Sequence, residues 1–171
     1  MRDWISLPAG VVTLAERFGG VEVSGASFGL MRAYVRSLIE PFAARIGSVS
    51  PDHLLGTSGT VTTIAGVQMR LRRYDRSRVD GSWLTNSEID DVVARLLAMS
   101  YEERAASPCI GRDRADLVLA GCAILDEIRT AFPASRLRVA DRGLREGMLA
   151  RLMREDGAYG NDGCPSAHAV L

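Results

Sequence analysis

The sequence predicts an α/β fold, in which short strands alternate with helices along the chain. Short apolar segments bounded by glycine- or proline-containing loops predict strands at residues 5–14, 53–55 and 137–141. Longer segments with apolar residues three and four positions apart predict the helices. The 171 residues suffice for one domain with a hydrophobic core, but not for two large ones.

The composition is that of an ordinary globular protein, and it creates no overall electrostatic field that would attract a polyanion. Hydrophobic residues make up 47%, and 21 basic residues balance 21 acidic ones. No segment approaches the roughly 18 consecutive apolar residues of a membrane span. We therefore expect no nucleic-acid partner and no membrane association, and an anionic ligand must be met by a local cluster of donors.

The cysteines and histidines do not form a metal motif. Cys109, Cys122 and Cys164 lie far apart without metal-binding spacing, and His53 and His168 are the only histidines. An odd cysteine count without an apolar signal segment is typical of the reducing cytoplasm. The sequence therefore predicts a cytoplasmic protein without a metal site, and it predicts Cys122 in the core.

The first part of the chain is predicted to hold one strand and one helix. Residues 5–14 are rich in β-forming side chains, although Pro8 and Gly10 interrupt them. Apolar side chains recur at helical spacing over residues 28–42, and Pro41 is expected to kink the end of that helix.

A glycine-rich turn at residues 56–60 is the most distinctive local feature. It reads Gly-Thr-Ser-Gly-Thr and joins the predicted strand at 53–55 to a mostly apolar helix over 61–71. Unpaired N–H groups and the positive end of the helix dipole at such a turn favour phosphate or another anion, whereas the hydroxyls can instead cap the helix. No Lys follows the second glycine, so this is not a Walker A loop. Taken alone, the turn fits an anion site and a ligand-free cap equally well.

Five arginines after this helix have two interpretations. A solvated face near a helix C-terminus, complementing the helix dipole, is the commoner case and the preferred one. A basic rim for a phosphate-rich ligand is the alternative. The residues are Arg70, Arg72, Arg73, Arg76 and Arg78.

Two capping boxes predict helix starts in the next part of the chain. Thr85 with Glu88, and Ser100 with Glu103, have the spacing in which two side chains satisfy each other's backbone N–H groups. Amphipathic apolar positions follow the first box, and a shorter helix follows the second.

The last part of the chain is predicted as helix, strand and helix. Residues 117–132 form a long apolar helix ended by Pro133, in which Gly121 allows close packing. The strand at 137–141 leads to a final helix over 144–153. One face of that helix is apolar, formed by Leu144, Met148, Leu149 and Leu152.

Four motifs in this order resemble the C-terminal part of the exopolyphosphatase and guanosine-pentaphosphate phosphohydrolase (Ppx/GppA) family. They are GTSGTVTTIAG, LTNSEIDDVVARLLAMSYEER, GRDRADLVLAGCAIL and LRVADRGLREGML. The opening ISLPAGVVTLAERF is similar to the family's strand just past its second glycine-rich phosphate loop. The likeness covers roughly residues 4–153. The acidic residue and phosphate loop that usually precede the opening strand are absent.

The resemblance implies a ribonuclease-H-like domain of the sugar-kinase/actin/Hsp70 superfamily, N-terminally truncated so that its first hairpin is missing. Residues 1–156 would form most of the second domain, and residues 157–171 a disordered tail. The strand near Val11 would then lack its partner and leave a gap in the sheet. We expect the chain to fill this gap by self-association as a homodimer, by strand exchange or by rearranging its N-terminal strand.

The family hydrolyses the terminal phosphoanhydride of inorganic polyphosphate, or the 5′-γ-phosphate of guanosine pentaphosphate, with Mg²⁺. The resemblance places the general base and the first phosphate loop in the missing N-terminal domain. This chain is then expected to form one wall of the phosphate cleft, to hold no Mg²⁺ and no catalytic residue, and to be inactive alone. A non-catalytic phosphate-binding or dimerisation module is the alternative. Nucleic-acid binding is weakly supported, because the net charge is zero and aromatic interleaving is absent.

The resemblance assigns the phosphate- or nucleotide-binding residues to three places. The turn would face the phosphate, and Arg114 would either reach a polyanion or be a surface arginine. In the closing motif, Gly143 would shape a strand-to-helix turn, while Arg145 and Glu146 are more simply an ion pair. The predicted binding residues are Gly56, Thr57, Ser58, Gly59, Thr60, Arg114, Asp141, Gly143 and Arg145.

Overall fold

The computed structural model describes residues 3–158. The chain divides into two units, Met1–Asp141 and Arg142–Leu171, and the first of them holds the sheet. Most of the predicted tail lies outside the described residues, as do Cys164 and His168.

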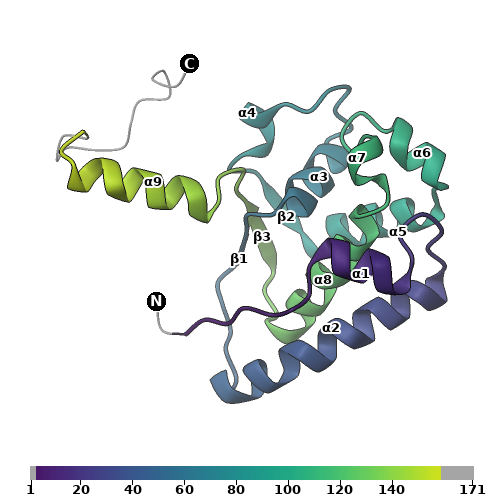
Figure 1. Cartoon of the computed structure of the whole chain (residues 1–171), viewed down its shortest axis with the longest axis horizontal. Helices are drawn as coiled ribbons and strands as arrows, with labels where there is room; N and C mark the ends of the chain where they lie inside the picture. The colour runs from purple at the N-terminus through teal and green to yellow at the C-terminus, as the bar shows by residue number, and fades with distance from the viewer. Residues whose placement is uncertain (1–2, 159–171) are drawn as a thin grey trace. The chain divides into compact units, whose positions relative to one another are not determined.

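A small mixed sheet organises the first unit (Figure 1). Its strand order is β1-β3-β2, with β3 (Arg136–Val139) in the middle. The strand β1 (Leu54–Gly56) runs parallel to β3, and β2 (Trp83–Thr85) runs antiparallel to it. The strands predicted at 53–55 and 137–141 are confirmed to within two residues, a margin usual for element ends. The sequence analysis missed β2, because its three residues lie directly between a turn and a helix N-cap and are too few to show a strand pattern.

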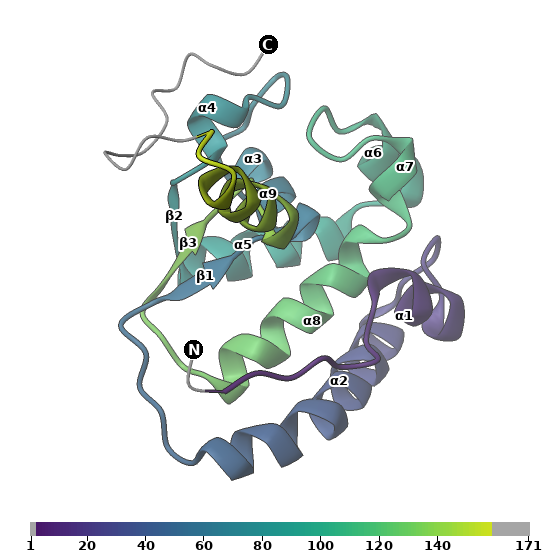
Figure 2. The ribbon, with the colours of Figure 1, turned by 60° about the vertical axis from the view of Figure 1, so that its left-hand side comes forward.

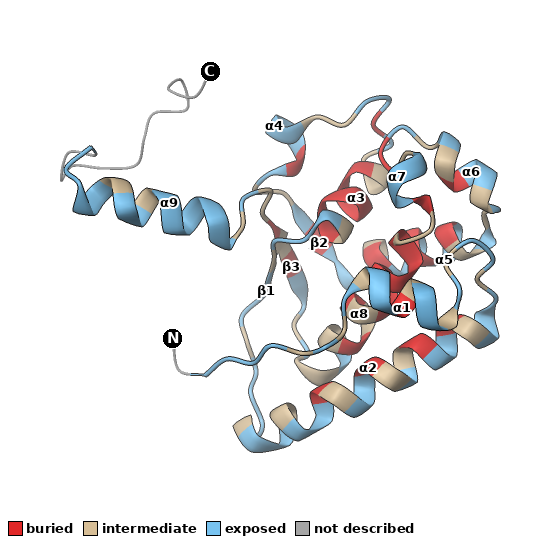
Figure 3. Ribbon diagram, in the orientation of Figure 1, coloured by how far each residue is buried: buried red, intermediate tan, exposed pale blue. Residues whose placement is uncertain are grey.

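Helices cover one face of this sheet (Figure 2). The buried strand residues Leu84, Leu137 and Val139 face them, and the long helix α2 packs along α8. Figure 3 shows the buried residues concentrated in α3, α5 and α8. The helices of the first unit are α1 (Val11–Phe18), α2 (Gly25–Ile46), α3 (Gly59–Gln68), α4 (Arg76–Val79), α5 (Asn86–Ala98), α6 (Tyr101–Ala106), α7 (Arg112–Ala115) and α8 (Val118–Ala131).

The prediction of a strand over residues 5–14 is wrong. Residues 3–9 form neither helix nor strand, and α1 begins at Val11, after Gly10 in an extended conformation. Val11, Leu14 and Phe18 recur at helical spacing, and Leu14 is fully buried. Burial of this stripe in the core outweighs the strand propensity of the two valines. The edges of the described sheet are therefore β1 and β2, and no strand lies at Val11.

Both capping boxes are confirmed. The Thr85 N–H donates to Glu88 Oε2 at 2.8 Å, and the Glu88 N–H donates back to Thr85 Oγ1 at 3.3 Å. At α6 the Ser100 N–H donates to Glu103 Oε2 at 2.7 Å. These bonds satisfy donors that a helix N-terminus leaves without intrahelical acceptors, so both helices begin where the sequence predicts.

The described cysteines are core residues. Cys122 lies within α8 as predicted, and Cys109 is buried as well. Burial raises the pKa of the Cys122 thiol to about 12, and it also raises the pKa of Cys109. Because the thiolate is the reactive form, both side chains act as small apolar residues.

A buried carboxylate joins α2 to α8. Glu127 on α8 is 1% exposed and accepts hydrogen bonds from Arg32 Nε at 2.7 Å and Arg36 Nε at 2.8 Å. Burial alone would raise the pKa of Glu127, but the two guanidiniums outweigh it and hold the pKa below 4.5. The carboxylate is thus ionised and fixes the register of the two longest described helices of the first unit.

A second contact brings α8 close to α3. A Cβ at Gly121 would overlap the Thr60 side chain, so only glycine allows α8 to approach the start of α3 this closely. The prediction that Gly121 serves close packing is therefore confirmed.

The second unit contains α9 (Leu144–Glu155), which confirms the predicted final helix. Gly143 precedes it, and its N–H donates to Glu146 Oε2 at 2.7 Å. Later in the same helix, Arg151 Nε pairs with Glu155 Oε1 at 2.8 Å, and these two residues lie one helical turn apart. The four apolar residues of its predicted face, Leu144, Met148, Leu149 and Leu152, are all more than half exposed.

We expect Glu127→Gln to lower the free energy of unfolding by about 1–3 kcal/mol at pH 7, because a neutral amide loses the charge-assisted hydrogen bonds from both arginines. The folded-state pKa of Glu127 is depressed, so its stabilisation is present above its ordinary pKa of 4.5 and is lost as the pH falls through the lower folded value. Urea denaturation of both proteins from pH 7 downwards should show the gap closing in acid. A gap that stays constant with pH would contradict this role.

We expect Gly121→Ala to cost about 1–3 kcal/mol, because the added methyl group must displace Thr60 or push α8 outward. The matched control is Gly29→Ala in α2, where an added Cβ meets nothing within 4 Å. That control should gain up to about 1 kcal/mol from helix propensity. Equal effects of the two substitutions in urea denaturation would show that the Gly121 contact is unimportant.

Candidate functional site

The glycine-rich turn joins β1 to α3 at the carboxyl edge of the parallel strands. A Cβ at Gly56 would lie 2.8 Å from Val61 Cγ2, so the turn is tight enough to require glycine there. The carbonyl of Gly56 accepts the Ala140 N–H at 2.9 Å and ties the turn to the chain after β3. Ligands of open α/β sheets bind at this edge.

Ser58 is the N-cap of α3. Its Oγ accepts the Val61 N–H at 3.3 Å, and its carbonyl accepts the Thr62 N–H at 3.2 Å. The capping role considered for the hydroxyls is therefore confirmed for Ser58. Within the described part of the chain, the N–H groups of Gly59 and Thr60 donate to no protein acceptor. These two donors, at the positive end of the helix, remain available to an anion.

Arg114 lies beside these donors, although its helix, α7, is far from the turn in the sequence. Its Nη1 donates to Thr63 Oγ1 at 3.4 Å, and a Cβ at Gly59 would lie 3.4 Å from the same nitrogen. A cavity of about 240 Å³ opens between the turn, Arg114 and the start of α8. Its lining residues are Val11, Ser58, Gly59, Thr60, Thr63, Arg114, Leu117 and Val118. The sequence analysis missed Thr63, since a threonine inside an apolar helix carries no signal of its own.

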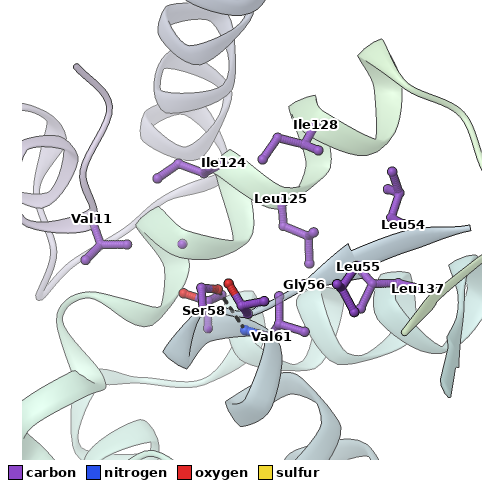
Figure 4. Close-up of a pocket in the computed structure, with 13 residues that line it drawn as sticks. Val11, Leu54, Leu55, Gly56, Ser58, Val61, Ile124, Leu125, Ile128 and Leu137 are labelled. Atoms are coloured by element: carbon purple, nitrogen blue, oxygen red, sulfur yellow. Dashed lines mark hydrogen bonds between the residues drawn. The ribbon is translucent and has the colours of Figure 1, made fainter. Parts of the chain in front are cut away.

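An apolar cavity of about 270 Å³ adjoins the same turn (Figure 4). Leu54 and Leu55 of β1 and Ile124, Leu125 and Ile128 of α8 line it. Val11, Ser58 and Thr60 line both this cavity and the one beside Arg114. The turn therefore borders both a basic cavity and an apolar one.

Asp141 is held in an ion pair close to its strand. Its carboxylate accepts from Arg76 Nε at 2.9 Å, its carbonyl accepts from Arg76 Nη2 at 3.0 Å, and its N–H donates to Asp80 Oδ1 at 2.9 Å. Arg76 thus neutralises the one carboxylate that the sequence analysis placed in the site. The neighbouring arginines Arg72, Arg73 and Arg78 are exposed, which agrees with the preferred solvated face.

Two of the predicted binding residues belong to the second unit. Gly143 is the N-cap of α9, as expected for a residue that shapes a strand-to-helix turn. Arg145 lies in the first turn of the same helix and is exposed. The structure brings together the residues of the turn and Arg114, and it shows Asp141 bound to Arg76.

Tyr74 is a polar residue of this region that the sequence analysis did not single out. Its hydroxyl is buried and has no hydrogen-bond partner among the described residues. Burial, and then the nearby carboxylate of Asp141, raises the pKa of Tyr74, so the hydroxyl stays protonated at neutral pH. A buried hydroxyl without a hydrogen bond is uncommon and lowers stability.

Clusters of metal-ligating side chains are absent from the described residues. Residues 3–158 contain no group of three or more His, Cys, Asp or Glu side chains that could hold an ion. The donors around the turn are N–H groups and a guanidinium, which suit anions rather than Mg²⁺. Within the same residues, no helix is long and apolar enough to cross a membrane.

The fold and this site define a class: an α/β protein whose small mixed sheet carries a glycine-rich strand-to-helix turn suited to anions. Comparison with known proteins makes the assignment specific. The model of the Ppx/GppA phosphatase family matches residues 1–156, and the chain belongs to this family.

Similar proteins agree with the assignment. Exopolyphosphatase 2 of Mycobacterium tuberculosis is 24% identical over 125 residues, which cover 71% of this chain and 39% of that protein. The crystal structure of the Aquifex aeolicus Ppx/GppA family member matches 95% of this chain and 51% of its own, at 27% identity and a TM-score of 0.76. An exopolyphosphatase from Cytophaga hutchinsonii shares the fold with a TM-score of 0.77 at 22% identity, over 89% of this chain and 50% of its own. The chain therefore spans about half or less of the length of these relatives.

We expect Tyr74→Phe to leave stability unchanged or to raise it by up to about 1 kcal/mol, because it removes a buried hydroxyl that has no partner. The midpoint of urea denaturation measures this directly. A loss of more than about 1 kcal/mol would mean that the hydroxyl makes a bond that stabilises the chain.

Proposed function

We propose that this chain forms one wall of the phosphate cleft of a Ppx/GppA phosphatase, with the turn at residues 56–60 and Arg114 as its phosphate-binding groups. The observation that carries the proposal is the meeting of two unpaired helix N–H donors with a guanidinium across a cavity of about 240 Å³. Backbone donors at a helix start and an arginine fork are complementary to phosphoryl oxygens.

The reaction proposed for the longer protein is hydrolysis of a terminal phosphoanhydride, of inorganic polyphosphate or of the 5′-γ-phosphate of guanosine pentaphosphate. Such transfer depends on stabilising negative charge on the phosphoryl group and on aligning the attacking water. The turn and Arg114 supply charge stabilisation only. The name of the tuberculosis relative, an exopolyphosphatase, supports polyphosphate as a substrate class.

The remaining parts of the reaction are proposed to lie outside this chain, in an N-terminal partner domain of a longer protein. In this arrangement Mg²⁺ and the general base belong to that domain, and residues 1–156 form an actin-like, ribonuclease-H-like second domain. Asp141 does not offer a base here, because Arg76 holds its carboxylate at 2.9 Å. We infer that the chain alone binds phosphate weakly and does not release it from a substrate.

The edge of β1 is the proposed place at which this missing part, or a second copy, joins the sheet. Among the described residues, β1 has a neighbour on one side only, Leu55 is 63% exposed, and the apolar cavity lies beside it. An added strand would satisfy the free backbone groups of β1 and cover these side chains.

Calorimetric titration of the 171-residue chain with inorganic tripolyphosphate tests whether the turn and Arg114 bind phosphate. Arg114→Gln should weaken binding by about tenfold, because it removes a charged donor to a phosphoryl oxygen. The matched control is Arg112→Gln on the same helix, whose guanidinium is exposed and lies 4.0 Å from Glu102. Arg112→Gln and the parent chain should bind tripolyphosphate with the same affinity.

Equal affinities of the parent and Arg114→Gln would contradict the proposed wall. Phosphate release from long-chain polyphosphate and from guanosine pentaphosphate, with and without Mg²⁺, should be absent for the chain alone. The same assay on a full-length homologous protein should show Mg²⁺-dependent turnover of at least one substrate. Turnover by the isolated chain would show that it contains a base of its own.

A further inference from the structure

The face of the sheet opposite the helices carries a cluster that the proposed cleft does not use. The register places Leu55, Arg138 and Trp83 in one row across the three strands, and Arg136 lies diagonally from Trp83. Leu55, Trp83 and Arg136 are exposed, and Arg138 is half-buried. His53 precedes β1, and its imidazole ring contacts the indole ring of Trp83. We call His53, Trp83, Arg136 and Arg138 the arginine–tryptophan cluster.

The indole ring of Trp83 holds this cluster together. The guanidinium carbons of Arg136 and Arg138 lie 4.2 and 4.8 Å from the ring centroid. The His53 ring meets the indole edge-on, with centroids 5.1 Å apart and planes at 76°. Stacking on an aromatic face orients a guanidinium while its N–H donors stay free for a ligand.

A turn also confines Arg138 from the opposite side. Gly81 has φ +78°, and a Cβ there would lie 3.1 Å from Arg138 Nη2. The Gly81 N–H donates to the Val139 carbonyl at 2.8 Å, which fixes this turn against β3. The guanidinium of Arg138 is thus positioned before any ligand arrives, and less side-chain entropy is lost when one binds.

Both arginines lack a counter-charge in the described part of the chain. Arg76, Arg36 and Arg129 each pair with a carboxylate, at 2.8 or 2.9 Å. No described carboxylate lies within 4.0 Å of the guanidinium of Arg136 or of Arg138. Two neighbouring cations held together without a counter-charge repel each other, and an anionic ligand relieves that repulsion.

We propose that the arginine–tryptophan cluster binds a chain of phosphoryl groups, as a second contact for a polyphosphate ligand. The proposal rests on the proposed function for the class of ligand. Planar guanidinium forks match phosphoryl oxygens, and two forks on one ring suit successive phosphoryl groups. The same ring contacts disfavour a nucleobase, because cations already occupy the indole that a base would stack on.

The cluster is distinct from the candidate cleft. Arg136 begins β3, whereas the glycine-rich turn follows the end of the parallel strand β1. Arg138 pairs with Leu55, one residue before the turn, so the cluster differs from the cleft by lying on the sheet face away from α3, α7 and α8. A polyphosphate long enough to reach both sites gains effective concentration at the second one, so affinity should rise with chain length.

Trp83 provides a direct probe. In a Trp4→Phe chain it is the only tryptophan, since the sequence has two. Titration of this chain with inorganic tripolyphosphate should change the Trp83 fluorescence saturably. Arg136→Gln and Arg138→Gln in the same background should each weaken that response by about tenfold, and added salt should weaken it further. The matched control is Arg17→Gln, which removes a guanidinium 4.3 Å from the Tyr34 ring.

The outcomes separate the two sites. If Arg136→Gln and Arg138→Gln lose the response while Arg114→Gln keeps it, the cluster is a binding site whatever the fate of the cleft. If only Arg114→Gln weakens binding, the cluster proposal fails and the cleft stands. Arg138→Lys keeps the charge and the fold but not the planar stack, and full retention of affinity would overturn the stacked-fork geometry. Tighter binding of a single-stranded oligonucleotide than of polyphosphate at equal charge would make nucleic acid the ligand and overturn the proposal.

Discussion

The close approach of α8 to the start of α3 is the constraint on which the rest of the first unit depends. Gly121 lets Thr60 pack directly against the α8 backbone, and Thr60 lines both cavities beside the turn. The same helix carries Glu127, whose bonds to Arg32 and Arg36 hold α2. Helix α8 therefore positions the turn, because Gly121 has no side chain to hold it away. The same helix positions α2 through the buried charge of Glu127.

The chain uses its arginines in three physically different ways, which explains how a neutral protein can present local sites for anions. Arg36 and Arg76 are neutralised by carboxylates. Arg104 is 2% exposed and donates to the carbonyls of Met99 and Val21 at 2.7 Å. Its burial lowers its pKa, and no carboxylate of residues 3–158 pairs with it. Arg114 and Arg136 lack a carboxylate partner among the described residues and lie at the surface. Net charge alone does not reveal this division of roles.

Local chemistry in the sequence predicted much of the fold, and long-range packing decided the rest. The boxes at Thr85 and Ser100, the helix containing Gly121 and the central strand were predicted because each rests on neighbours within a few residues. The helix at Val11 was predicted as a strand, since its valines favour strands and its burial depends on distant partners. Of the site, the turn was visible from its glycines. The contact of Arg114 with Thr63 joins residues far apart in the chain and needed the structure.

The central position of β3 has a consequence for how the chain folds. β1 and β2 both pair with β3 and not with each other, and β3 is the last of the three to occur in the sequence. The sheet cannot begin to form until that late segment is present, and closing the loop from Leu54 to Leu137 carries an entropic cost. Helices can form earlier, since their bonds are local. A chain emerging from the ribosome would therefore expose β1, with its glycine-rich turn, as an unpaired segment until β3 follows.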